Sequence, residues 1–371
     1  MTLIFTEEQE QLRTSLRRFL ADKAPGAAVR LWMESDQGQD PAVWRQMAEQ
    51  LGLHGVALPE KYGGSGGGPV ELGIVLAEMG RMLLPSAYFA TVALAGQALA
   101  ASADDAAKAR WLPSIADGSL TATLALAEER GSWRPEDVTT SATRSGDGWI
   151  LTGTKMFVVD GHTAGLLLVV ARTEAGPALF AVVGDAVGVT RARLDALDPT
   201  RRLARIDLDR VAAERVGPAG DQSAYLGTVF ALVGTALAAE QVGGAQACLD
   251  AAVQYAKIRV QFGRPIGSFQ AIKHKCADLL VDVEAARSAA YHAAAEAAEG
   301  STGLPVAAAL AAAYCSKAYT HAAKENIQIH GGIGYTWEHD AHLYLKRAIS
   351  SEQLFGSPAL HRARLADLIG I

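Results

Sequence analysis

A segment in the last third of the chain gathers cations and amides around a break between two helical patterns. Residues 254–278 read QYAKIRVQFGRPIGSFQAIKHKCAD. The Gly-Arg-Pro-Ile-Gly break separates two runs of apolar residues at helical spacing, so we expect two helices to meet here. Arg259, Arg264, Gln270 and Lys273 fall near this corner, and such a group suits an anion such as a pyrophosphate. By residue type alone, a solvated helix corner explains the same cluster.

Length and composition set the broad class of the protein. The chain has 371 residues, which allows two or three domains, and 50% of them are hydrophobic. No run of about 20 apolar residues occurs, so we expect no membrane span. The N-terminal segment carries acids early and lacks the basic start of a signal peptide. The net charge of −6 argues against nucleic-acid binding.

The three cysteines, Cys248, Cys276 and Cys315, lie far apart within apolar helical patterns. This spacing favours reduced core thiols over disulfides or metal ligands. Because reduced cysteines are typical of the cytosol, we expect a cytoplasmic protein.

Three blocks with different periodicity follow one another along the chain. Residues 1–118 read as helices, with Thr6 as a cap before a run of acids. Residues 119–217 alternate or run β-branched between turns, which predicts an antiparallel β domain. Residues 218–371 return to helical spacing, and their separation from the strands favours an α+β fold over a doubly wound one. Four long helices with short links predict a bundle, over residues 225–258, 269–299, 305–330 and 342–354.

Two other motifs are weaker candidates for chemistry. The glycine-rich segment 59–68 lacks the Lys-Ser/Thr of a P-loop and follows no clear strand, so we expect a turn between helices. His339, Asp340 and His342 lie close together in sequence, but neighbouring positions on a helix point apart, so we expect no metal site. Small residues over 236–244 are typical of a roomy pocket for bulky or branched groups.

Three sequence segments closely resemble the acyl-CoA dehydrogenase flavoproteins, and the resemblance covers nearly the whole chain. They are RVQFGRPIGSFQAIKHKCADL at 259–279, QIHGGIGYTWEHDAHLYLKRA at 328–348 and LPEKYGGSGGG at 58–68. The resemblance implies an N-terminal helical domain, a middle β-barrel domain and a C-terminal four-helix bundle. It also implies α,β-dehydrogenation of an acyl-CoA thioester, in which a carboxylate takes the α-proton and FAD takes the β-hydride at flavin N5.

The resemblance places the cofactor-binding residues in two groups. In the family, a neighbouring subunit holds the adenine and pyrophosphate end of FAD. The matching residues here are all intact: Arg259, Phe262, Gln270, Gln328, Gly331 and Gly332. At the flavin end, Ala127 replaces the family's threonine in Thr-Glu-Pro, and Val159 replaces a threonine that would bond near N5. Phe157 stands where the family has a tryptophan that shields the flavin.

The catalytic base is where the sequence departs most from the family. The commonest glutamate position, just before a Gly after the last bundle helix, holds Phe355, and the alternative position holds Val233. Gly234 replaces an arginine that commonly follows the alternative position. The nearest acid is Glu240, two turns or about 10 Å along the helix. It is open to three roles: base, polar lining of a pocket, or structural acid. Glu352 is a less favoured candidate for the base.

Three functions stay open on this basis. The chain is an active dehydrogenase with Glu240 as a displaced base, or it is a base-less partner in a mixed α2β2 assembly. Otherwise it is a flavin-free structural or acyl-CoA-binding subunit. The resemblance implies FAD, an acyl-CoA substrate and an electron-transferring flavoprotein as oxidant. It also implies oligomers, either a homodimer or homotetramer or an α2β2 assembly with a related subunit.

Overall fold

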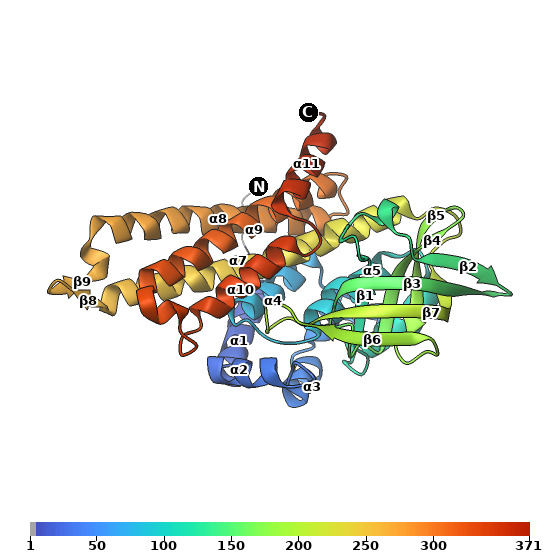
Figure 1. The fold of residues 1–371 in the computed structure, drawn as a ribbon, viewed down its shortest axis with the longest axis horizontal. Coiled ribbons are helices and arrows are strands. Elements are labelled where there is room, and N and C mark those ends of the chain that lie inside the picture. Colours follow the sequence, from blue (N-terminus) through green and yellow to red (C-terminus); the bar gives the residue numbers. More distant parts are fainter. Residues whose placement is uncertain (1–4) are drawn as a thin grey trace.

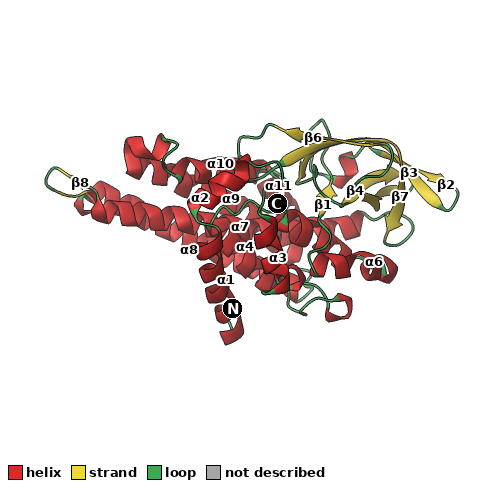
Figure 2. Cartoon of the chain, turned by 90° about the horizontal axis from the view of Figure 1, so that it is seen from below, coloured by secondary structure: helices red, strands yellow, loops and turns green. Residues whose placement is uncertain are grey.

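The computed structural model describes residues 5–371 and has three parts (Figure 1). Long helices form one end of the molecule and the β domain forms the other, with the N-terminal helices packed beneath the junction (Figures 1 and 2). The predicted α+β architecture is therefore confirmed. Residues 1–4, at the start of the segment whose composition argues against a signal peptide, lie outside the described residues.

The N-terminal part is helical, as predicted. Thr6 caps the first helix: its hydroxyl accepts from the backbone N–H of Gln9, while its own N–H donates to the Gln9 side chain at 3.0 Å. Residues 89–96 form a π-helix that continues directly into an α-helix. The α-helices are α1 (Glu7–Lys23), α2 (Gly26–Glu34), α3 (Pro41–Glu49), α4 (Pro69–Arg81), α5 (Gln97–Ala101) and α6 (Asp105–Ala116).

The middle part is a closed sheet. Strand β4 pairs with β2 and with β5, and the path β2-β3-β7-β5 joins the two, so the sheet returns on itself. Most pairings are antiparallel, but β1–β4 and β2–β4 are parallel, which the long connections between these strands allow. The strands are β1 (Ala122–Ala125), β2 (Ser141–Ser145), β3 (Gly148–Val159), β4 (Leu166–Thr173), β5 (Gly176–Val183), β6 (Val189–Leu194) and β7 (Leu203–Val216).

The C-terminal part contains the four predicted helices and a fifth. The Gly-Arg-Pro-Ile-Gly break is a short hairpin between α7 and α8. The additional helix α11 projects from the body (Figure 1), and none of its residues is buried. The elements are α7 (Ser223–Ile258), β8 (Val260–Gln261), β9 (Arg264–Pro265), α8 (Gln270–Ala298), α9 (Leu304–His330), α10 (Ala341–Gln353) and α11 (Pro358–Ile369).

Helix α7 is a long, largely buried helix of the C-terminal part. It is the one helix in the described residues that is long and apolar enough to cross a membrane, yet 83% of its most apolar window is buried within the fold. It packs against α4, α8 and α9. Because α7 is buried within the fold, its apolar composition is that of a core helix.

The small residues over 236–244 serve close helix packing, and they do not widen a pocket. A methyl group at Gly243 would overlap the carbonyl oxygen of Ala77 on α4, and one at Gly80 would overlap the backbone of Glu240. A methyl group at Gly244 would overlap the ring of Tyr319 on α9. The interpretation of this stretch as a roomy pocket is therefore wrong, because backbones meet where side chains are absent.

Gly243→Ala should destabilise the protein by about 1–3 kcal/mol, since overpacking forces neighbouring backbones apart. Gly227→Ala is the matched control on the same helix, because a methyl group there meets nothing within 4 Å. It should be neutral or stabilising by up to about 1 kcal/mol. Denaturant unfolding monitored by circular dichroism measures both changes, and equal effects of the two substitutions would contradict the packing argument.

Candidate active site

The residues predicted to hold the adenine end of FAD gather at the far end of the helical bundle. The end of α7, the β8–β9 hairpin and the start of α8 meet the end of α9 there, where Tyr255 stacks on His330 with ring centroids 4.2 Å apart. Phe262, at the hairpin tip, is 91% exposed and has a φ of +53°. Five further members are exposed: Arg259, Gln270, Gln328, Gly331 and Gly332.

Two histidines support this end of the bundle from beneath. His330 Nδ1 lies 2.8 Å from the Asn326 carbonyl oxygen, so this nitrogen carries the proton, and burial lowers the pKa of His330. His339 accepts from the Ala341 N–H and lies 4.3 Å from His330, ring centroid to ring centroid. In the described residues, no three His, Cys, Asp or Glu side chains are placed to share a metal ion.

The predicted flavin end lies in the β domain, at the opposite end of the molecule from the β8–β9 hairpin (Figure 1). The Ala127 carbonyl accepts from the Met156 N–H at 2.8 Å, which places Ala127 beside the predicted shielding residue. That residue, Phe157, is 36% exposed, whereas Ala127 and Val159 are each 1% exposed. The chain's own residues therefore cover both of the latter side chains.

FAD fits the two groups of residues unequally. The adenine and pyrophosphate end has suitable residues: the guanidinium of Arg259 and the side-chain amides of Gln270 and Gln328. Gly331 and Gly332 leave open space above their backbones, so a ligand can approach closely. At the flavin end, the apolar side chains of Ala127 and Val159 replace the family's threonine hydroxyls. Both side chains are buried. The residues present thus fit the adenine and pyrophosphate half of FAD, and those at the flavin end do not fit the flavin ring in the same way.

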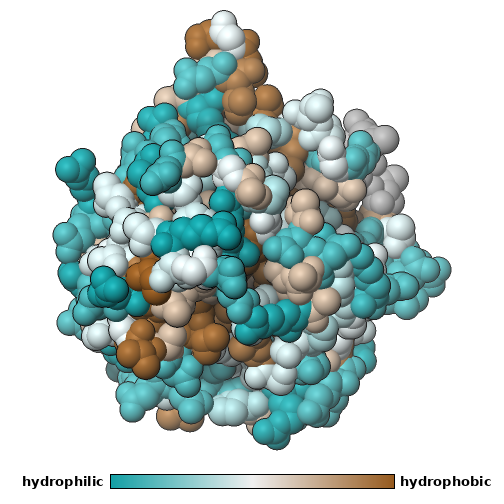
Figure 3. Space-filling view, turned by 90° about the vertical axis from the view of Figure 1, so that its right-hand side faces the viewer, coloured by the Kyte–Doolittle hydropathy of each residue, from teal (hydrophilic) through white to brown (hydrophobic). Residues whose placement is uncertain are grey.

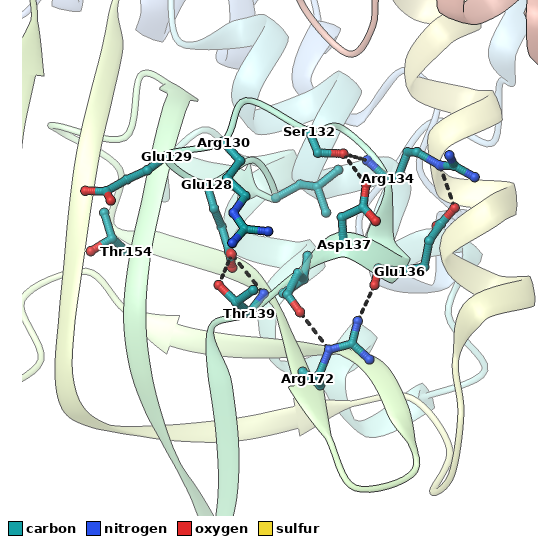
Figure 4. Close-up of a pocket in the computed structure, with 12 residues that line it drawn as sticks. Glu128, Glu129, Arg130, Ser132, Arg134, Glu136, Asp137, Thr139, Thr154 and Arg172 are labelled. Carbon is teal, nitrogen blue, oxygen red and sulfur yellow. Dashed lines mark hydrogen bonds and ion pairs between the residues drawn. The ribbon is translucent and has the colours of Figure 1, made fainter.

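A cavity of about 720 Å³ lies beside the flavin end, under the loop that follows β1 (Figure 4). Its acids are largely paired: Glu128 binds buried Lys155 at 2.8 Å, Glu129 binds Arg205 at 3.0 Å, and Glu136 binds a neighbouring arginine. We name it the Arg172 cavity, after the arginine that donates to the carbonyls of Val138 and Glu136. It is lined by Leu126, Glu128, Glu129, Arg130, Ser132, Arg134, Glu136, Asp137, Val138, Thr139, Thr154 and Arg172.

A second cavity, of about 330 Å³, adjoins the family's usual base position. We name it the Phe355 cavity. Phe355 has a φ of +61° and packs its ring 4.8 Å from that of Trp133. Val233, at the alternative base position, is completely buried. The cavity is lined by Trp133, Arg134, Pro135, Glu136, Ser223, Gly227, Phe230, Gly234, Phe355, Leu360, His361, Ala363, Arg364 and Asp367.

Glu240 lines neither of these cavities. It faces a separate space of about 20 Å³, enough for about one water molecule, at the junction of the three parts of the chain. Its carboxylate binds Arg347 Nη1 at 3.0 Å and also Arg201. Both arginines are buried. This geometry favours the structural role among the three open to Glu240.

The two arginines belong to a larger charged network that joins loop 198–202 to α7 and α10. Arg347 Nε binds Asp198 at 2.6 Å, and Arg201 donates to Ser351 at 3.3 Å. Burial acts to lower the pKa of Arg347, but Asp198 and Glu240 outweigh it and raise that pKa. Glu352, one residue beyond Ser351, accepts from Thr320 on α9 at 2.7 Å and lines neither the Arg172 nor the Phe355 cavity.

Sequence reasoning missed several residues of this region. Trp133 carries no motif, and its contact with Phe355 joins positions more than 200 apart in the chain. Arg347 occupies an ordinary helical position, whereas Asp198 and Arg201 lie between two strands. The only available signal was Glu240 itself, because an acid in an apolar stretch requires a partner.

Family models of all three acyl-CoA dehydrogenase domains match this chain. The N-terminal domain matches residues 6–119, the middle domain 123–211 and the C-terminal domain 226–369. Together these matches cover most of the chain.

Relatives and solved structures agree with the domain matches. The chain is 39% identical to the acyl-CoA dehydrogenase IpdE2 of Mycobacterium tuberculosis, over 95% of this chain and 94% of that protein. A variant of the Tcur3481-Tcur3483 steroid ACAD is 34% identical, covers 98% of both chains and superposes with a TM-score of 0.90. A chain of the ChsE4-ChsE5 complex from M. tuberculosis is 28% identical, with a TM-score of 0.91 over 100% of this chain and 99% of that one. The chain therefore belongs to the acyl-CoA dehydrogenase family, whose members are FAD-dependent oxidoreductases.

Proposed function

We propose that this chain is the base-less subunit of a heteromeric acyl-CoA dehydrogenase. The observation that carries the proposal is the aromatic residue at the base position, where the ring of Phe355 packs on Trp133 in place of a carboxylate. Glu240 supplies no substitute, because two arginines hold its carboxylate at a space too small for an acyl group. A partner subunit would then supply the base and the flavin-side contacts.

The contribution of this chain would be the adenine half of the partner's FAD site. When bound, FAD supplies the hydride acceptor of the reaction. The guanidinium of Arg259 would bind the pyrophosphate, and the side chains of Phe262, Gln270 and Gln328 would border the nucleotide. Because these residues are exposed and lie at the opposite end from the β domain (Figure 1), they would complete the site of another subunit.

Two solved relatives with paired names support this assembly. The solved relatives Tcur3481-Tcur3483 and the ChsE4-ChsE5 complex are each named for two different proteins. A chain of each aligns with this chain over nearly its whole length. We infer a mixed assembly, with α2β2 as the simplest form. An electron-transferring flavoprotein as oxidant stays a prediction from the family.

The test is the flavin content and bleaching of this chain, alone and co-expressed with a candidate subunit that carries glutamate at the position of Phe355. Because the chain alone has no base, addition of an acyl-CoA should not bleach any flavin that it retains. The co-purified pair should be yellow and should bleach under anaerobic conditions. Bleaching of flavin on the isolated chain by an acyl-CoA would overturn the proposal.

Arg259→Ala in the co-expressed pair should lower flavin retention at least tenfold, because a charge-assisted contact to the pyrophosphate is lost. Lys257→Ala is the matched control, since Lys257 is an exposed cation two residues earlier, at the end of α7. Flavin absorbance per mole of pair after gel filtration gives the measurement. Equal retention in the two variants would remove Arg259 from the cofactor site.

A further inference from the structure

An ion pair joins the N-terminal part of the chain to loop 331–340, which begins with two of the predicted cofactor residues, Gly331 and Gly332. Arg30, on α2, donates to one carboxylate oxygen of Asp340 from Nε at 3.0 Å and from Nη2 at 2.7 Å. Nη2 also donates to the His339 carbonyl oxygen at 3.2 Å. The far end of this loop is therefore fixed to a helix that lies about 300 positions earlier in the chain.

The carboxylate of Asp340 makes this contact instead of capping a helix. Asp340 is the N-cap of α10, a position where an aspartate ordinarily accepts from a backbone N–H of the first turn. Within residues 5–371 its side chain makes no such bond, and His339 Nδ1 accepts from the Ala341 N–H at 3.1 Å instead. Gly26, at the start of α2, permits the close approach, because a methyl group there would lie 2.6 Å from Asp340 Oδ2. Both sides of the contact thus have the residues that it requires.

A series of three rings links this loop to the end of α7. The rings of His339 and His330 lie 4.3 Å apart, centroid to centroid, and His330 stacks on Tyr255 at 4.2 Å. The carbonyl oxygen of Tyr255 accepts from the Arg259 N–H at 2.9 Å, at the point where α7 ends. Arg259 is therefore connected to α2 through an unbroken series of contacts.

The ion pair is exposed enough that its effect should be local. The side chains of Arg30 and Asp340 are 25% and 43% exposed, and ion pairs at such exposure contribute little to the stability of the whole fold. A loop that is already ordered loses less conformational entropy when a ligand binds to it. The affinity for a ligand at loop 331–340 is therefore the property that this contact should change.

We propose that Arg30 and Asp340 are positioning residues for the adenine half of the FAD site. They fix loop 331–340 and, through the three rings, the end of α7 that carries Arg259. Neither side chain needs to touch the cofactor to act in this way. The inference rests on the proposed function for the identity of the ligand, and it adds the contacts that preorganise the site.

Limited chymotrypsin digestion of the full chain tests the order of the loop without a cofactor. Tyr335 and Trp337 are 72% and 62% exposed and supply cleavage sites within the loop. Arg30→Gln should raise the rate of cleavage there about fivefold, because cleavage tracks the population of the open loop. The midpoint of denaturant unfolding should not change. Arg13→Gln is the comparison, since Arg13 forms an ion pair with Glu10 at 2.5 Å within α1, and it should match the parent chain.

Titration of the flavin-stripped, co-purified pair with FAD measures the positioning effect itself. Arg30→Gln and Asp340→Asn should each weaken FAD binding about fivefold while the pair assembles normally in gel filtration. The double variant should bind no more weakly than either single variant, because both substitutions break the same contact. Arg30→Lys keeps the charge but not the two-pronged geometry, so it should restore part of the affinity.

Unchanged FAD affinity in both Arg30→Gln and Asp340→Asn would overturn the inference, and so would additive losses in the double variant. Arg259→Ala in the same titration reports separately on the proposed function. If Arg259→Ala weakens FAD binding and the other two variants do not, only the positioning role fails. If Arg259→Ala also leaves FAD binding unchanged, the proposed cofactor site fails and the positioning role fails with it.

Discussion

Glu240→Gln should lower the free energy of unfolding by about 3 kcal/mol or more, because it leaves two buried arginines without their shared carboxylate. Removing one partner from a buried ion pair costs about 3–5 kcal/mol in measured cases. Arg347 keeps Asp198 at 2.6 Å, but Arg201 keeps only a hydroxyl contact and the face of Phe89. Denaturant unfolding at pH 7 measures the loss.

The matched control is Glu352→Gln. Glu352 is partly buried and accepts a hydrogen bond from the hydroxyl of Thr320, so an amide retains most of that contact. We expect a change below about 1 kcal/mol. If Glu240 were instead the base, its substitution would leave stability nearly unchanged and abolish flavin bleaching in an assembly that contains this chain. A stable Glu240→Gln protein with that defect would return Glu240 to the catalytic role.

The fold was predictable because its signals are local. The Thr6 cap, the change from helical to strand periodicity near residue 119 and the break after α7 each act within a few residues of sequence. Helix α11 was missed because its residues alternate polar and apolar types without a buried face, and Figure 3 shows this end of the chain projecting with apolar side chains exposed. Leu368, Ile369 and Ile371, at the C-terminal end of the chain, are exposed.

The candidate site was predictable only where its residues lie in sequence motifs that resemble those of a known family. The adenine-side residues occupy two short motifs, and the structure brings these motifs together through the contact of Tyr255 with His330. By contrast, the partners of Glu240 come from loop 198–202 and from α10, and no periodicity relates those segments. The sequence therefore identifies an acid that needs a partner, while only the tertiary structure identifies that partner.

The small residues of α7 show the same limit in another way. Gly234 and Gly243 are both glycines on one helix, but a side chain at Gly243 would enter the backbone of α4 and one at Gly234 would enter an open cavity. Composition is identical at the two positions, so sequence alone does not separate tight packing from empty space. The difference lies in which helix faces each position.

Asp160→Asn should stabilise the protein at pH 8 and leave its stability near pH 4 almost unchanged. Asp160 faces the same small space as Glu240, with a φ of +51° at the end of β3. Burial raises its pKa from 3.8 to about 7, although Arg201, Arg202 and Arg347 act in the opposite direction, and Glu240 adds to the increase. Asparagine tolerates the left-handed backbone conformation, so the substitution changes the charge without adding strain.

The sign of the pH effect follows from proton binding. Between pH 3.8 and about 7 the folded protein holds a proton on Asp160 that the unfolded chain has released. This contribution to stability is therefore complete below pH 3.8 and is lost as the pH rises towards 7. The neutral amide removes the penalty of a buried carboxylate, on the order of 2–4 kcal/mol above pH 7. Unfolding free energies of both proteins, measured from pH 4 to pH 8, should diverge across this interval. A difference between them that is constant with pH would show that Asp160 does not titrate there.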